Sequence, residues 1–284
     1  MAKVAVVTDS TAVLPESVEG VTVVPTKVVI GGETHDDGLG PSSSSEAVVS
    51  ALSERAEVST SRPAPAVFGE VYAQLAEQGY DEIVSIHLSA EMSGTFDSAR
   101  VAGANAPVPV VAVDSRTVGP GLGFAVLAGL EVVRRGGSAG QAAEAARERA
   151  EETRSFFYVD TLEYLRRGGR IGAAAALLGS ALAVKPLLTI EEGRVVLRER
   201  VRTSGRALAR LEELAVEQGD GRPVEVVVAH LGAAERAEAL VRELSERMAD
   251  GLAGRDVRCG EIGAVLGAHV GPGMIAVVVA PALS

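Results

Sequence analysis

Short apolar runs alternate with longer amphipathic segments through the first half of the chain. The apolar runs are rich in Val and Ile and predict strands at 4–8, 21–24, 27–30, 80–89 and 108–113. Helical spacing and helix-start residues predict helices at 15–17, 46–56, 66–78, from 93 towards 107, from 124 to 136 and at 141–154, with a loop at 31–45. Strands that alternate with helices form βαβ units, so this half predicts an α/β domain with a parallel sheet covered on both faces.

The pattern changes near residue 155, after which strands no longer alternate regularly with helices. Strands are predicted at 156–159, 186–190, 194–200, 224–229, 257–262 and 274–280, and helices at 161–167, 171–183, 204–218 and 233–249. This half predicts an α+β domain with an antiparallel or mixed sheet. We therefore expect two tightly packed domains, residues 1–155 and 156–284, because no low-complexity linker separates them.

Composition narrows the choice of partner and compartment. The net charge of −11 argues against nucleic acid or an anionic membrane surface as the main partner. Cys259 is the single cysteine, which excludes an internal disulfide and suits the cytoplasm. The longest apolar stretch, 171–184, is too short to span a bilayer. These features predict a soluble, cytoplasmic protein without a membrane-spanning segment.

Polar residues follow the predicted parallel strands where those strands end. Asp9 and Asp114 each end a strand, and Ser93-Gly94-Thr95 opens the helix after the central strand. Carboxyl ends of parallel strands share one edge of a sheet, where ligands usually bind. The first turn of a helix offers free N–H groups and a positive dipole end, so the Ser-Gly-Thr turn predicts a site for a carboxylate or a phosphate. A purely structural role for Ser93 in capping the helix stays open.

Several motifs occur in a fixed order along the chain. They are Thr8-Asp9-Ser10-Thr11, Thr60-Ser61-x-Pro63, the segment 92–99, Asp114-Ser115, the segment 161–171, Lys185-Pro186-Leu187-Leu188 and the segment 269–273. Together they resemble the DegV family of bacterial fatty-acid-binding proteins. The resemblance runs nearly from end to end and is specific to the family rather than to one member.

The resemblance implies a fold and a mode of binding. The fold is an N-terminal α/β domain and a C-terminal α+β domain with a lipid tunnel between them. A Thr or Ser of the first hydroxyl segment, here Thr60 or Ser61, holds the fatty-acid carboxylate together with Ser93 of the Ser93-Gly94-Thr95 turn. We also expect His269 either to reach the carboxylate or to brace its own loop.

The resemblance also implies a partner. Members present a bound long-chain fatty acid to a fatty-acid kinase, which brings ATP and Mg²⁺ and forms the acyl phosphate. This chain is then a carrier with no catalysis, cofactor or metal of its own. Arg170 and Arg202 are candidates for contacts to the head group or the kinase, and either arginine can equally be an ordinary solvated side chain.

The chain departs from the family pattern in two places. Arg62 and Ala64 occupy positions where members often carry Gln and Ser, and Val13 stands where Asp is usual. Neither change removes a head-group hydroxyl. Arg62 adds a cation beside the predicted head-group loop, so it joins the candidate contacts.

A fatty acid needs a dry tunnel and a small polar anchor. Burying sixteen carbons is worth on the order of 12 kcal/mol in gross terms. A hydrogen bond to a carboxylate contributes about 1.5–3 kcal/mol. The tail therefore supplies affinity and the head group fixes orientation. The apolar segment 171–188 is a candidate tunnel lining, although it reads equally well as a core helix.

Two other functions use the same residues. Ser93, His269 and Asp114 supply the residue types of a serine hydrolase, but the chain has no Gly-x-Ser-x-Gly motif. A phosphate or nucleotide binder would need a Gly-x-x-x-x-Gly-Lys loop, which is also missing. We interpret the glycines at 119–123 as a turn and His87 as a core histidine, and we assign no role to His35 or His230.

Overall fold

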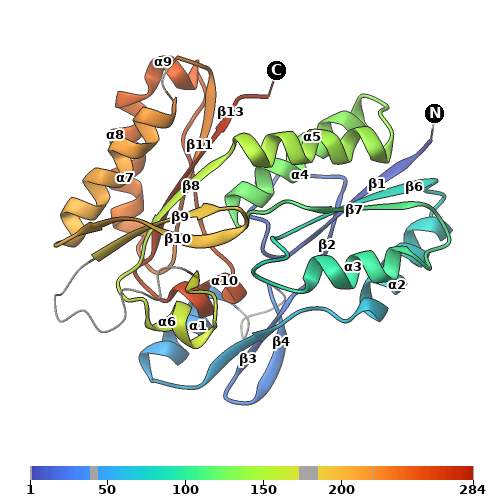
Figure 1. Ribbon diagram of the computed structural model, residues 1–284, viewed down its shortest axis with the longest axis horizontal. Coiled ribbons are helices and arrows are strands. Elements are labelled where there is room, and N and C mark those ends of the chain that lie inside the picture. Colours follow the sequence, from blue (N-terminus) through green and yellow to red (C-terminus); the bar gives the residue numbers. More distant parts are fainter. Residues whose placement is uncertain (1, 39–43, 173–184, 220, 284) are drawn as a thin grey trace.

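Three sheets organise the computed structural model, which describes residues 2–38, 44–172, 185–219 and 221–283. Their strand orders are β2-β1-β6-β7, β10-β9-β8-β13-β11-β12 and β4-β3-β5. The predicted helix at 171–183 lies almost wholly outside the described residues. Figure 1 shows the two larger sheets side by side, with helices between them and on their outer faces.

The four-stranded sheet is entirely parallel. It consists of β2 (Val21–Val24), β1 (Val4–Asp9), β6 (Glu82–His87) and β7 (Val110–Asp114). Helices α2 (Pro65–Glu77) and α3 (Thr95–Gly103) cover one face, and α4 (Pro120–Arg134) and α5 (Ala139–Glu152) cover the other (Figure 1). The prediction of an N-terminal parallel α/β arrangement is therefore confirmed.

The six-stranded sheet is mixed. Its strands are β10 (Arg194–Val201), β9 (Lys185–Glu191), β8 (Arg154–Tyr158), β13 (Ile275–Pro281), β11 (Val224–His230) and β12 (Arg258–Glu261). Only β11 and β12 pair in parallel; the other neighbours are antiparallel. The predicted α+β character of this half is confirmed. The proposed division after residue 155 falls inside β8 and stays a prediction.

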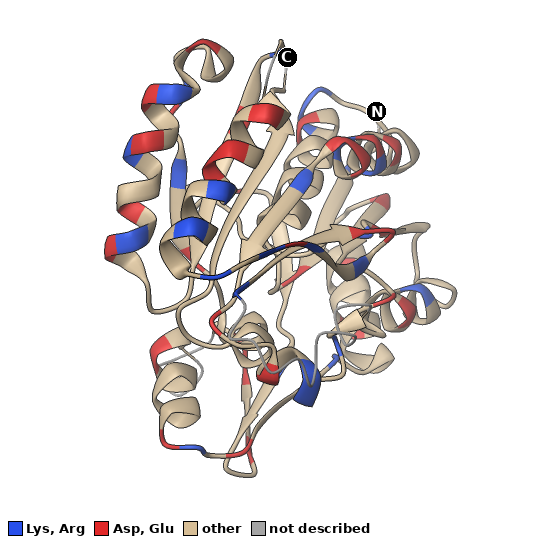
Figure 2. Ribbon diagram, turned by 60° about the vertical axis from the view of Figure 1, so that its left-hand side comes forward, with Lys and Arg blue, Asp and Glu red and all other residues tan. Residues whose placement is uncertain are grey.

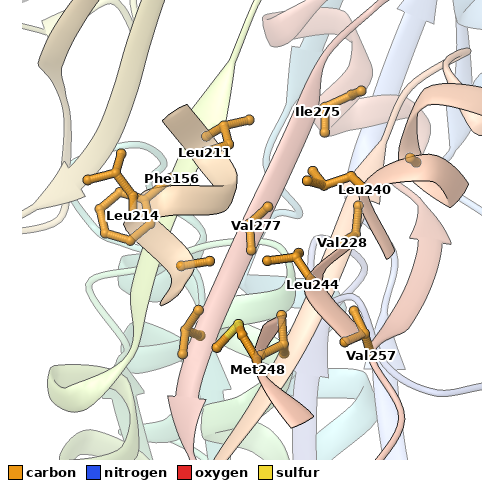
Figure 3. Packing of buried hydrophobic residues seen from close by; sticks show 14 of the residues in the cluster. Phe156, Leu211, Leu214, Val228, Leu240, Leu244, Met248, Val257, Ile275 and Val277 are labelled. Carbon is orange, nitrogen blue, oxygen red and sulfur yellow. The ribbon is translucent and has the colours of Figure 1, made fainter. Parts of the chain in front are cut away.

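The outer face of this sheet carries a large aliphatic core. It packs against α7 (Ser204–Gly219), α8 (Ala234–Arg247) and the short α9 (Ala249–Leu252). Figure 3 shows Leu211 and Leu240 facing Val277 from the two helices. On the opposite face of the sheet, Phe124 of α4 contacts Val278. Helix α4 thus lies between the two large sheets and joins the halves of the molecule.

The small antiparallel sheet connects the first part of the chain to the last. It contains β4 (Glu33–Asp36), β3 (Lys27–Ile30) and β5 (Val58–Ser61), next to α1 (Ser45–Ser53), α6 (Glu163–Arg167) and α10 (Ala264–Val270). Val28 of β3 packs in one cluster with Val48 of α1 and Val265 of α10. Asp37 accepts a hydrogen bond from the Val265 backbone N–H at 3.3 Å, so the N-terminal half caps a C-terminal helix.

Four local predictions were wrong. Residues 33–36 form β4 rather than a loop, because they pair with β3. Residues 15–17 do not form a helix but end in a turn. Helix α10 was not predicted, since its cap comes from a residue far away in sequence. Segment 119–123 is not a separate turn: α4 already begins at Pro120, where proline is pre-organised for a helix.

Gly123 explains why this glycine-rich stretch enters a helix. A Cβ at Gly123 would lie 2.2 Å from the carbonyl oxygen of Val13. The missing side chain lets α4 approach the loop after β1 closely. Gly123 is therefore explained by the packing of α4 against this loop.

In Figure 2, the Lys, Arg, Asp and Glu positions are concentrated on the helices and the connecting segments. Within the described ranges, no helix is both apolar and long enough to traverse a bilayer.

Candidate functional site

A cavity of about 370 Å³ lies between the sheets and is lined by both halves of the chain. Its apolar walls include Leu88, Met92, Phe157, Ile190, Leu266 and Ala276. Its polar lining includes Thr60, Ser61, Arg62, Ser93, Arg170 and His269. No Asp or Glu occurs among the described lining residues. The cavity thus combines a long apolar wall with a polar region that lacks negative charge.

Thr60 of β5 and His269 of α10 meet in this polar region. Thr60 Oγ1 lies 2.9 Å from His269 Nε2. A Cβ at Gly168 would lie 2.1 Å from His269 Nδ1, so the backbone of Gly168 packs directly against the ring. Nδ1 is buried and has no hydrogen-bond partner in the described part of the chain. The ring is thus held by Thr60 on one side and by the chain after α6 on the other.

Burial keeps His269 neutral. Desolvation, helped by the positive charge of Arg170, lowers the pKa of His269 to about 4. When Nε2 carries the proton, it donates to Thr60 Oγ1 and leaves the Thr60 hydroxyl hydrogen free for a ligand. His269 can therefore orient Thr60 as a donor.

This lowered pKa predicts a pH effect on stability. Between about pH 6.5 and pH 4, the unfolded chain binds a proton at His269 that the folded protein does not, so its contribution to the free energy of unfolding falls as the pH falls. We expect the wild type to lose on the order of 2 kcal/mol more than His269→Gln between neutral pH and about pH 4.5. Urea unfolding of the ligand-free proteins measures this difference, with His35→Gln as control. Equal losses in wild type and His269→Gln would contradict the prediction.

Ser93 belongs to the turn that leads into α3. Its Oγ lies 2.9 Å from Thr95 Oγ1 and accepts a hydrogen bond from the Thr95 backbone N–H at 3.3 Å. Thr95 is fully buried and does not line the cavity. Thr95 thus orients the Ser93 hydroxyl, and Ser93 faces the cavity.

Two guanidinium groups border this turn. A Cβ at Gly94 would lie 1.9 Å from an Nη atom of Arg62, so the arginine side chain lies directly on the Gly94 backbone. Arg170 Nε donates to the carbonyl oxygen of Met92 at 2.9 Å. Arg62 forms no ion pair with any carboxylate of the described residues. The region around Ser93 is therefore positively charged and suited to an anion.

Arg202 is not part of this cluster. It follows β10 as an exposed residue and does not line the cavity. Ser61, by contrast, does line it.

The structure does not assemble a Ser-His-Asp triad from the predicted residues. Asp114 Oδ1 accepts hydrogen bonds from the backbone N–H groups of Ala90 and Arg116, at 3.2 and 2.9 Å. His269 is bonded to Thr60 instead of Ser93. Among the described residues, no three His, Cys, Asp or Glu side chains gather as metal ligands either.

Asp9 and His87 form a buried polar pair away from the cavity. Asp9 Oδ2 lies 3.0 Å from His87 Nδ1 and accepts from the Leu88 N–H at 3.1 Å. His87 Nε2 lies 2.7 Å from Ser85 Oγ. The interpretation of His87 as a core histidine is confirmed, and Asp9 organises the sheet edge without touching the cavity.

Some lining residues were not identified from the sequence. Thr11 and Thr26 add hydroxyls, and alternate residues of β8 and β13 form one wall. Met274, Ala276 and Val278 share a face because side chains alternate along a strand. The alternation could be recognised in the sequence, but the pairing of β13 with β8, which completes this wall, could not.

Sequence comparison assigns the family. A family model described as "Uncharacterised protein, DegV family" matches residues 3–282. The chain belongs to the DegV family. A DegV domain-containing protein of Streptomyces coelicolor is 52% identical over 279 residues, which cover 97% of this chain and 98% of that protein. One from Deinococcus radiodurans is 40% identical over 284 residues, with 98% of each covered.

Solved DegV structures share the fold. A fatty-acid-binding DegV protein from Thermus thermophilus superimposes with a TM-score of 0.90 at 32% identity, covering 99% of this chain and 100% of that one. DegV of Bacillus subtilis, described as a fatty-acid-binding protein, gives 0.88 at 30% identity, with 99% and 100% covered. The predicted DegV-like fold is confirmed.

Proposed function

We propose that this protein is a fatty-acid carrier that holds a long-chain fatty acid in the cavity, with its carboxylate at Thr60 and Ser93. The observation that carries the proposal is the lining itself: hydroxyl and guanidinium groups gather in one region of an otherwise apolar cavity. Two solved relatives that share the fold are described as fatty-acid-binding proteins, which supports the same ligand class here.

Each polar residue has a distinct part in this proposal. Thr60 and Ser93 donate hydroxyl hydrogens to the carboxylate, with Ser61 beside Thr60 as a further donor. His269 and Thr95 orient these hydroxyls through the contacts already described. Gly94, which has no side chain, leaves room for the Arg62 guanidinium to lie on the turn beside Ser93, and no cofactor or metal is required.

We further propose that a partner, a fatty-acid kinase, phosphorylates the bound carboxylate. The described lining residues offer no carboxylate to act as a base, so the chemistry would come from the partner together with its ATP and Mg²⁺. Arg170 and Arg62 are exposed and border the polar region, where an approaching kinase would meet them. Arg202 is proposed as a more distant contact. Such a kinase would use cytoplasmic ATP, in keeping with the predicted location.

Native mass spectrometry before and after organic extraction tests the carrier function. We expect the purified protein to carry a mass that matches a fatty acid and to rebind palmitic acid after extraction. Labelling of Ser93 by a fluorophosphonate probe, with no released fatty acid, would instead support a hydrolase and refute the proposal.

Head-group variants test the proposed anchor. The double variant Thr60→Val with Ser93→Ala removes two donors to the carboxylate. We expect the preference for palmitic acid over hexadecanol to fall by at least about tenfold, since each bond to a charged group is worth about 1.5–3 kcal/mol. Competition against a fluorescent fatty acid measures this ratio. Ser50→Ala, an exposed serine on α1, is the control. An unchanged ratio in the double variant would contradict the assignment.

A further inference from the structure

The end of the cavity remote from His269 contains a hydroxyl that the proposed fatty-acid site does not use. The strand pairing fixes its place. Ser155 of β8 lies opposite Val278 of β13, and Phe157 lies opposite Ala276. Met274, Ala276 and Val278 advance along one wall by two residues at a time, so Ser155 lies roughly 13 Å beyond Met274 along the strand. His269 belongs to α10, which leads directly into Met274, so Met274 marks the carboxylate end of the cavity. Ser155 therefore lies at the methyl end of a bound chain.

Two residues at this end are largely buried, and their hydroxyl groups have no partner in the described part of the protein. Ser155 is 7% exposed and Thr117 is 5% exposed. Neither hydroxyl forms a hydrogen bond with another described residue. Both lie beside Gly121, where a Cβ would be 3.4 Å from Ser155 Oγ and 2.4 Å from Thr117 Oγ1. An alkyl tail that covered them would offer no hydrogen-bond partner, which is unfavourable, whereas a hydroxylated tail would offer one.

A second cavity adjoins this end. It has a volume of about 610 Å³, and Ser155 and Ile190 line both cavities. Thr117, Thr153 and Thr189 are part of its lining. Of its charged groups, Arg116 pairs with Glu192, and Arg154 donates to the carbonyl oxygens of Glu151 and Thr153, whereas the Arg198 side chain lines the cavity without an ion pair among the described residues. The two described residues that line both cavities, Ser155 and Ile190, are uncharged, so the junction itself suits a neutral polar group.

The first turn of α4 adds a donor. Gly121 follows Pro120 at the start of this helix, where backbone N–H groups have no partner within the helix. The absence of a side chain at Gly121 leaves room for the two hydroxyls beside the start of the helix. Two hydroxyls and a helix N-terminus together can bond an oxygen of a ligand.

From these contacts we infer that the protein accepts long-chain fatty acids that carry a hydroxyl group at the methyl end, recognised by Ser155 and Thr117. This inference rests on the proposed fatty-acid site, because the carboxylate must be held at Thr60 and Ser93 for the far end of the chain to reach the junction. It adds a substrate class to that site.

The test compares palmitic acid with ω-hydroxypalmitic acid in one competition assay. In the wild type we expect the two acids to bind with dissociation constants within about threefold of each other, because the added hydroxyl regains at the junction the bonds it loses to water. In the double variant Ser155→Ala with Thr117→Val, we expect the hydroxy acid to bind at least tenfold more weakly than palmitic acid. Thr117→Ser, which keeps the hydroxyl, should retain the wild-type ratio.

Each outcome decides something. The same ratio in the wild type and in the double variant would overturn the inference. Loss of the hydroxy acid in the double variant alone would support it. Failure of palmitic acid itself to bind the wild type would refute the proposed function, and is therefore distinguishable from failure of this inference.

Discussion

Ala276→Phe is expected to weaken fatty-acid binding roughly a hundredfold while the protein stays folded. Ala276 lies in the middle of the β13 wall, between Met274 and Val278, and its small side chain lines the cavity. A phenyl ring there would occupy the space of several methylenes, each worth about 0.8 kcal/mol. Losing four of them weakens binding by about 3 kcal/mol, or roughly a hundredfold. Native mass spectrometry and palmitic acid titration measure the loss.

The control for this variant adds the same ring elsewhere. Val101 lies on α3 and is 48% exposed, so Val101→Phe places the phenyl group outside the cavity. We expect it to keep its bound lipid. If Ala276→Phe also retained palmitic acid with wild-type affinity, the acyl chain would have to lie elsewhere, and the cavity would not be the site.

Asp9→Ala is expected to lower the free energy of unfolding by about 3–5 kcal/mol, the cost of removing one partner from a buried, hydrogen-bonded Asp–His contact. Asp9 is fully buried and accepts hydrogen bonds from Thr11 and from the Leu88 N–H, besides its contact with His87. Without the carboxylate, these donors remain buried and unsatisfied. Urea unfolding measures the change.

A surface carboxylate provides the comparison. Asp97 pairs with Arg100 on α3 at 3.1 Å, and its side chain is 57% exposed. Asp97→Ala should cost less than about 1 kcal/mol, as exposed ion pairs do. Equal losses for Asp9→Ala and Asp97→Ala would show that the buried network contributes no more than a surface pair.

The sequence predicted elements wherever hydrophobic periodicity was strong. The parallel strands and the β9–β10 hairpin came from this signal, and the structure confirms them. Helix α10 was missed because its N-terminus is capped by Asp37, 228 residues earlier in the chain. A local pattern carries no information about such a partner.

The residues of the candidate site could be predicted from the sequence only in part. The Ser93 turn was identified from the chemistry of a helix start, and the cavity lining includes it. The idea that every polar strand end faces a ligand was too broad. Asp114 instead accepts hydrogen bonds from the backbone N–H groups of Ala90, in the loop after β6, and of Arg116. Ser89 donates to the carbonyl oxygen of Gly193. Parallel strands end at the same edge of the sheet, but the direction of each terminal side chain depends on how it packs.

The contact between Thr60 and His269 spans 209 positions of the chain. Neither half, expressed as an isolated fragment, would possess both members of this pair. A fragment ending near residue 155 would also lack the helix that covers Val28, and would expose that apolar surface to water. Dissection of the gene into separate halves is therefore expected to yield insoluble or inactive products, with binding restored only when the pieces reassemble.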